Sequence, residues 1–384
     1  MTIQDLHQNE ALRHREFPVT ARKNFLAHAA VCPLPRRVAD AVRLQAENAT
    51  LDDQETAYGH TEIRETRALA AKLINADLGE VALVGPTSLA LSFVAGGLSF
   101  RRAANILVYY DDYPSNVYPW MALAEKGVEV RFINVRQLGR IRVSDVLGQV
   151  DENTALVALA SCHFISGWRI EYETIGLALR EQGILFCLDA IQTVGAFPIN
   201  AQAVDFLAAD AHKWLLGPCA AGILYVRKEV QDLLEPIVLG WHNVRCANFV
   251  AQENIVHPPD ARRYEAGSFN LHGYVGLKAA MELLLEIGVD NIGAELVRKR
   301  DRMVPVLQSR GWEVVGANAP EVNRSGIVAI RRDEADLAAL HARLAEQNVV
   351  LSLRTDRQGR HYLRFSPHFY NTDAEIDRAI ELLG

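Results

Sequence analysis

The stretch DAHKWLLGP (residues 210–218) places Lys213 between a histidine and a tryptophan, just before a Gly-Pro pair. The run that leads into it, DFLAAD (205–210), has the length and composition of a buried β-strand. A helix does not continue through a Gly-Pro pair, so we expect Lys213 in a loop at the end of that strand. In open α/β sheets, ligands bind beyond the carboxyl ends of the strands. The stretch therefore predicts a functional lysine at a sheet edge.

The composition is typical of a globular protein with a large core, because 49% of the 384 residues are hydrophobic and 23% are charged. A net charge of -7, without a dense Lys/Arg block, argues against nucleic acid as a partner. The five cysteines form no CxxC pair, which predicts neither disulfides nor a metal site and favours a reducing compartment. We find no signal-peptide pattern and no apolar run long enough for a bilayer, so we expect a cytoplasmic protein without membrane binding.

Short apolar runs alternate with helix-like segments over the first two thirds of the chain, which predicts an α/β fold with a mostly parallel seven-stranded sheet. The runs are residues 81–84, 105–110, 128–135, 154–161, 184–190, 205–210 and 222–226. A helix is expected over 273–288. The C-terminal part predicts a smaller α+β domain, with strands near 312–316 and 325–331, a helix near 333–347, a hairpin of 349–354 and 361–366, and a last helix that begins at a capping box of Thr372 and Glu375.

Two further signals lie at the same sheet edge as Lys213. The first strand runs into GPTSLALS (85–92), where Thr87 and Ser88 open a helix whose free amides suit a phosphate group, although both residue types are also common helix caps. Asp189 ends the run LFCLD, where a helix cap is the alternative. Together, a lysine, a strand-end acid and a phosphate-binding helix start are typical of a pyridoxal phosphate (PLP) site.

Six motifs in order make the chain resemble the class V aminotransferase family of PLP enzymes, which has fold type I and includes cysteine desulfurases, selenocysteine lyases, kynureninase and isopenicillin N epimerase. The motifs are FLAHAAVCPLPRRVADAV (25–42), DDYPSNVYPW (111–120), LDAIQTVGAF (188–197), DAHKWLLGP, RYEAGSFNLHGYVGLKAAMELL (263–284) and LRFSPHFYNTDAEID (363–377). The resemblance covers nearly the whole chain. It implies an N-terminal arm (1–20), a large PLP-binding domain (21–265, with interface loops 236–265) and a small domain (266–384).

The resemblance also implies how the cofactor is held. Lys213 is similar to the lysine that forms the Schiff base, and His212 to a residue that contacts the phosphate or sets the lysine. The other cofactor contacts that it implies are Asp189 on the pyridine nitrogen, Gln192 on the ring oxygen, Tyr113 stacked on the ring, and Thr87 and Ser88 on the phosphate. Asp210 stands where many relatives have a small phosphate ligand. Since a carboxylate repels a phosphate, we expect Asp210 to turn toward a backbone amide or His212.

At the substrate end, the resemblance implies that Arg364 holds the α-carboxylate of an amino acid, a task suited to a planar guanidinium. Arg354 on the partner strand is a second candidate, with a surface salt bridge as the alternative. Ser268 in EAGSFN implies a homodimer in which this serine reaches the other subunit's phosphate. Trp241 corresponds to a residue near the substrate mouth or to a core tryptophan, and Asn116 fits local turn chemistry better than substrate contact.

The fate of the substrate is left open by these motifs. Desulfurases carry a cysteine between the two arginines, whereas the segment here, TDRQGRHYL (355–363), has none, so we expect this chain not to be a cysteine desulfurase of the usual type. Cys187 fits the core, and only Cys162 and Cys219 are candidates to approach a substrate. The first prediction is transamination, with a carbon-heteroatom lyase or an amino-acid epimerase as alternatives and a non-catalytic PLP-fold binding protein as a distant one.

Overall fold

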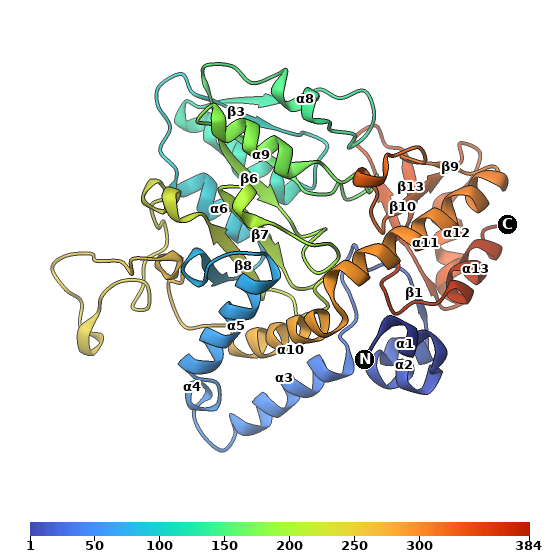
Figure 1. Cartoon of the computed structure of the whole chain (residues 1–384), viewed down its shortest axis with the longest axis horizontal. Helices are drawn as coiled ribbons and strands as arrows, with labels where there is room; N and C mark the ends of the chain where they lie inside the picture. Colours follow the sequence, from blue (N-terminus) through green and yellow to red (C-terminus); the bar gives the residue numbers. More distant parts are fainter.

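The computed structural model describes all 384 residues, and a seven-stranded sheet lies at its centre (Figure 1). The strand order is β2-β8-β7-β6-β5-β3-β4; β8 is antiparallel to both neighbours, and all other pairs are parallel. The predicted mostly parallel sheet is therefore confirmed. The strands are β2 (Val81–Val84), β3 (Asn105–Val108), β4 (Glu129–Phe132), β5 (Thr154–Ala160), β6 (Leu185–Asp189), β7 (Phe206–Asp210) and β8 (Gly222–Val226).

Helices cover both faces of this sheet, which is why its strands are apolar on consecutive residues. In β5, Val157 and Leu159 enter the larger core, whereas Leu156 and Ala158 enter a second core on the opposite face. Helix α10 packs against α3 and α5. The helices of this part of the chain are α3 (Arg36–Asn48), α4 (Gln54–Ala57), α5 (His60–Leu73), α6 (Thr87–Gly97), α7 (Tyr118–Met121), α8 (Val143–Leu147), α9 (Tyr172–Glu181) and α10 (Leu271–Ile287).

The C-terminal part forms an antiparallel sheet of order β12-β13-β10-β9 with its own core, as expected for a smaller α+β domain. Leu363 and Phe365 of β13 face that core, and Arg364 between them faces the other way. The elements are α11 (Val289–Ser309), β9 (Glu313–Val314), β10 (Val328–Arg331), α12 (Leu337–Glu346), β12 (Ser352–Thr355), β13 (His361–Phe365) and α13 (Asp373–Glu381).

Helix α11 is the main element that the sequence analysis did not assign. It follows α10 after the single residue Gly288, whose φ of 87° is a conformation that favours glycine. The predicted helix end at Gly288 is correct, but the chain immediately starts a second helix. Many charged residues and Pro305 obscure its pattern, although Ile292, Leu296 and Leu307 recur on one buried stripe.

The N-terminal segment connects the two domains. Helices α1 (Ile3–Gln8) and α2 (Glu10–Glu16) lie beside the small domain, where Arg13 forms an ion pair with Glu375 at 2.8 Å (Figure 1). Strand β1 (Asn24–Phe25) then pairs with β11 (Val349–Val350), and the chain passes on toward the large domain. No helix in the structure has both the length and the apolar character needed to span a membrane.

Candidate active site

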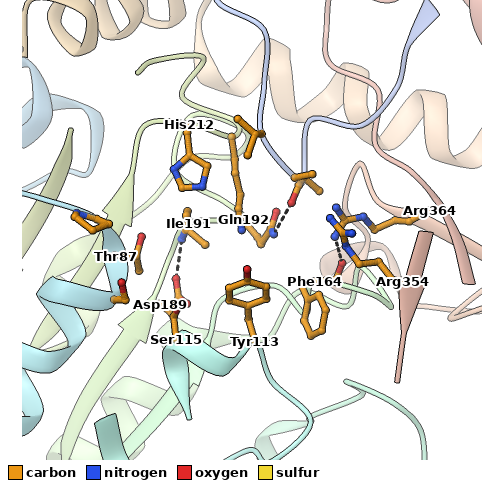
Figure 2. A pocket seen from close by; sticks show the side chains of 16 residues that line it. Thr87, Tyr113, Ser115, Phe164, Asp189, Ile191, Gln192, His212, Arg354 and Arg364 are labelled. Atoms are coloured by element: carbon orange, nitrogen blue, oxygen red, sulfur yellow. Dashed lines mark hydrogen bonds between the residues drawn. The ribbon is translucent and has the colours of Figure 1, made fainter. Parts of the chain in front are cut away.

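A cavity of about 240 Å³ lies beyond the carboxyl ends of the central strands. Strand β6 ends at Asp189, and Lys213 follows the end of β7 in the next loop. Figure 2 shows Thr87 and His212 on one side of the cavity and Arg354 with Arg364 on the opposite side. The predicted site residues that line the cavity are Thr87, Ser88, Tyr113, Asp189, Gln192, His212, Lys213, Arg354 and Arg364. Asp210 and Ser268 do not line it.

Lys213 is buried, with only 5% of its surface exposed. Burial lowers the pKa of its amine to about 8, although the nearby Asp189 opposes this shift. An ordinary lysine has a pKa of about 10.4, so at neutral pH the neutral amine is present here in a fraction larger by about two orders of magnitude. A neutral amine is the form that attacks a carbonyl group, and the site therefore activates Lys213 as a nucleophile.

Asp189 supplies a buried negative charge opposite the lysine. Its carboxylate accepts a hydrogen bond from the backbone amide of Ile191 at 3.1 Å, and burial raises its pKa. Tyr113 flanks the same space, with its ring centroid 5.1 Å from Lys213 Nζ and an edge contact to Phe164. A buried carboxylate without an ion pair is costly, so Asp189 would suit a cofactor that brings a protonated ring nitrogen.

No side chain caps the start of α6, so Thr87 and Ser88 do not serve as helix caps, which was the alternative to a phosphate site. The N-cap is Pro86, and no side chain caps the helix. Thr87 Oγ1 is buried without any hydrogen-bond partner, and Ser88 is exposed at the cavity. Free amides and an unpartnered hydroxyl at a helix N-terminus match a phosphate group.

Asp210 is turned away from the cavity. Its carboxylate accepts hydrogen bonds from the amides of Ala211, Ala220 and Ala221 at 2.7, 3.1 and 3.0 Å, and it contacts His212 Nδ1 at 2.8 Å. This is the orientation that charge repulsion from a phosphate requires. Asp210 thus acts on the cavity only through its neighbour His212.

Gln192 is held at both ends of its amide. Its Oε1 accepts a hydrogen bond from Trp214 Nε1 at 2.8 Å, and its Nε2 donates to the carbonyl of Ala29 at 3.1 Å. The latter bond ties the site to the N-terminal segment, whose residues 29–31 form part of the cavity wall. One amide hydrogen of Gln192 remains for a ligand, so its predicted contact with the ring oxygen stays a prediction.

The small domain contributes two positive charges to the cavity. Arg364 is 1% exposed, donates to the Phe164 carbonyl and to Ser352 Oγ, and has a buried Nε without a partner. Burial and the neighbouring Arg354 lower its pKa. Arg354 donates only to the Leu353 carbonyl and forms no salt bridge, so its alternative reading as a surface ion pair is wrong. Two guanidinium groups without a carboxylate partner suit an anionic substrate group.

Several candidate residues lie outside this cavity. Ser268 is exposed and lines a second depression with Trp241, which is itself 41% exposed and therefore not a core tryptophan. Cys162 and Cys187 are buried, and the exposed Cys219 does not line the active-site cavity. Burial raises the pKa of Cys162 to about 11, so it is a poor nucleophile here.

Other residues of the site carried no sequence signal strong enough to identify them. Phe164 lines the cavity and supplies the carbonyl that Arg364 binds. Asp112 is buried and accepts hydrogen bonds from the amide of Tyr113 and from Asn116 Nδ2, which holds the Tyr113 loop in place. The strand-end position of Asp112 was the available signal. Asn116 donates inward to this network and does not line the cavity.

The fold and the site together define a PLP-dependent enzyme of fold type I: they provide a buried lysine, an opposing carboxylate, an uncapped helix start and a guanidinium pair. A model of the family described as aminotransferase class-V matches residues 24–379. The chain therefore belongs to the class V aminotransferase family, and its cofactor is pyridoxal 5'-phosphate. The bound cofactor supplies an electron-withdrawing ring that stabilises negative charge at the substrate Cα.

Several similar proteins carry names that refer to sulfur chemistry. The chain is 28% identical over 394 residues to a probable cysteine desulfurase of Methanothermobacter thermautotrophicus, covering 96% of this chain and 95% of that protein. The apo structure of a cysteine desulfurase from Thermococcus onnurineus NA1 superposes with a TM-score of 0.86 at 24% identity, covering 96% of each chain. A cystine C-S lyase in complex with cysteine persulfide gives a TM-score of 0.87 at 20% identity, covering 96% of this chain and 98% of that one.

These relatives contradict the expectation that the chain is not a cysteine desulfurase of the usual type. That expectation rested on the absence of a cysteine from the hairpin between Arg354 and Arg364. Lys213, Asp189 and Arg364 line the cavity whether or not the hairpin carries a cysteine. One missing side chain in the hairpin therefore does not exclude cysteine as the substrate.

Proposed function

We propose that the protein is a C-S lyase that acts on cysteine or a close sulfur-containing derivative. The observation that carries the proposal is that the relatives spanning nearly the whole chain bear the name cysteine desulfurase. The site supports it, because Arg354 and Arg364 suit the α-carboxylate of a substrate and line the same cavity as Lys213. These relatives favour C-S cleavage over the transamination expected from the motifs.

The roles of the side chains in this reaction follow from their charges. Arg364 binds the α-carboxylate, which orients the substrate Cα toward Lys213. The neutral amine of Lys213 removes the Cα proton, and the Cβ–S bond then breaks with its electron pair on sulfur. The sulfur leaves as sulfide from cysteine or as cysteine persulfide from cystine, and water converts the remaining three-carbon unit to pyruvate and ammonia. Asp189 keeps the ring nitrogen protonated, and Tyr113 covers one face of the ring. His212, Thr87 and Ser88 hold the phosphate.

The reaction type is tested by product analysis. The holoenzyme is incubated with L-cysteine, L-cystine, L-alanine and L-aspartate, and sulfide, persulfide, alanine and pyruvate are measured. We expect catalytic release of sulfur from cysteine or cystine without any added keto acid. Stoichiometric conversion of the cofactor to its amine form, with turnover only after a keto acid is added, would instead identify a transaminase and overturn the proposal.

We also propose that the active unit is a homodimer in the cytoplasm. Ser268 lies outside the cavity of its own chain, and the loop at 236–260 extends from the body of the molecule in Figure 1. This loop exposes apolar side chains of a kind that a partner covers, including Leu239, Phe249 and Ile255 at 52, 79 and 63%. Five free cysteines support a reducing compartment.

Replacing Ser268 with alanine tests the shared site. We expect PLP to dissociate about tenfold more readily, because one hydrogen bond to the phosphate is lost. Dialysis against buffer followed by cofactor absorbance measures the loss, and sedimentation checks that the dimer persists. The matched control is Ser309→Ala, an exposed serine at the end of α11. Equal retention in both variants would argue against a phosphate contact across the interface.

A further inference from the structure

Asp210 lies close to the end of the cavity that suits a phosphate, and its carboxylate is already hydrogen-bonded by other groups of the protein. Its side chain is 1% exposed, and its two oxygens meet three backbone amides and His212 Nδ1. Three amide donors favour the ionised carboxylate over the protonated one. The remaining contact is with His212. Its Nδ1 must then carry a proton, because two acceptors do not face each other at 2.8 Å.

The other ring nitrogen of His212 determines what the cavity offers a phosphate. Nε2 has no protein partner, and the His212 side chain lines the cavity together with Thr87 and Ser88 (Figure 2). A neutral imidazole with its proton on Nδ1 would present a lone pair at Nε2, which repels a phosphate oxygen. Only the imidazolium can donate to Asp210 and to a phosphate at the same time.

We propose that Asp210 is a positioning residue that makes His212 a cationic phosphate ligand, so that His212 is doubly protonated in the cofactor complex. The carboxylate, imidazolium and phosphate then alternate in charge. This inference depends on the PLP cofactor and not on C-S cleavage, so the two proposals fail separately.

The other titratable groups around His212 do not supply this charge pattern. The amide of Cys32 donates to the His212 carbonyl, and burial raises the pKa of the Cys32 thiol to about 12. The hydroxyl of Tyr274 on α10, near Asp210, also has a raised pKa through burial. Both stay neutral at physiological pH. Lys213, the neighbour of His212, also titrates near neutral pH, because burial lowers its pKa to about 8 while Asp189 opposes this shift.

The binding experiment uses pyridoxamine 5'-phosphate, because this probe has the phosphate but does not react with Lys213. Its dissociation constant from the apoprotein is measured by calorimetry across the neutral pH range. The proteins are the wild type, Asp210→Asn, His212→Gln and the double variant. Comparison with His212→Gln isolates the contribution of His212, since Lys213 and the probe are the same in all four measurements. Pyridoxine, which lacks the phosphate, is the control ligand.

We expect Asp210→Asn to weaken binding of the probe by about tenfold to a hundredfold, as for the loss of a charge-assisted hydrogen bond. His212→Gln should weaken it similarly. In the His212→Gln background, Asp210→Asn should then have little further effect. If Asp210→Asn costs the same factor in both backgrounds, Asp210 merely holds the loop and the proposal is wrong.

Two controls keep the result interpretable if Asp210→Asn folds poorly. Asp205 adjoins the opposite end of β7 and also accepts a backbone amide, from Phe186, so Asp205→Asn is a matched change remote from the cavity, and it should leave the affinity for the probe unchanged. In the unaltered protein, nitrogen NMR of ¹⁵N-labelled histidine should show both His212 ring nitrogens protonated in the probe complex. A bare Nε2 in that complex would overturn the proposal without any variant.

Discussion

Replacing Lys213 with alanine is expected to abolish turnover, with a loss of about 10⁴-fold or more, because the residue both binds the cofactor and moves the Cα proton. Borohydride reduction should no longer attach the cofactor to the purified variant, because the amine that bonds it is gone. Lys213→Arg, which keeps the charge but has no neutral amine at neutral pH, should be as inactive. Cofactor attachment by borohydride and turnover that persist in Lys213→Ala would contradict the assignment.

A second buried lysine provides the matched control. Burial also lowers the pKa of Lys299 to about 8, but Lys299 pairs with Glu295 and does not line the cavity. Reduction with borohydride followed by peptide mass spectrometry should therefore attach the cofactor to Lys213 and not to Lys299. Loading of the apoprotein should accelerate as pH rises to about 8 and then level off, because the amine of Lys213 becomes fully neutral above its pKa.

Replacing Arg364 with alanine is expected to lower kcat/KM for the amino acid by about a hundredfold, through loss of a charged, two-pronged contact with the α-carboxylate. Arg364→Lys should recover part of this loss, since an ammonium keeps the charge but not the planar fork. The measurement is steady-state turnover of cysteine. Because Arg364 is buried without a carboxylate partner, thermal melting should show that the alanine variant still folds.

A substrate that lacks the α-carboxylate tests whether Arg364 acts through that group. Cysteamine, which has the amine and thiol of cysteine without the α-carboxylate, should be turned over equally by the wild type and Arg364→Ala. The matched control is Arg360→Ala, because Arg360 belongs to the same hairpin but pairs with Asp356 outside the cavity. If Arg364→Ala reduced turnover of cysteine and cysteamine by the same factor, Arg364 would support the fold and not the carboxylate.

The local sequence pattern was sufficient to predict the placement of a side chain wherever that placement depends on the residue's position along a strand. In β13, Leu363 and Phe365 enter the small core while Arg364 between them faces the site, because successive strand residues point to opposite faces. The strand-end positions of Asp189 and Lys213 likewise predicted that they lie at one edge. Helix α11 escaped this reasoning because its charged residues and Pro305 hide a single apolar stripe.

By itself, the sequence determined the sheet through its short periodic patterns, whereas the prediction of a cofactor lysine and an amino-acid substrate came from the resemblance in motif order. Only the tertiary structure decided how charges from distant segments compensate one another. In the folded protein, Arg354 and Arg364 have no carboxylate partner, and Thr87 Oγ1 has no hydrogen-bond partner. The carboxylate of Asp210 accepts hydrogen bonds from the amides of residues 220 and 221. The charge and proton states of buried groups depend on desolvation and on neighbours far away in the chain, which no local pattern encodes.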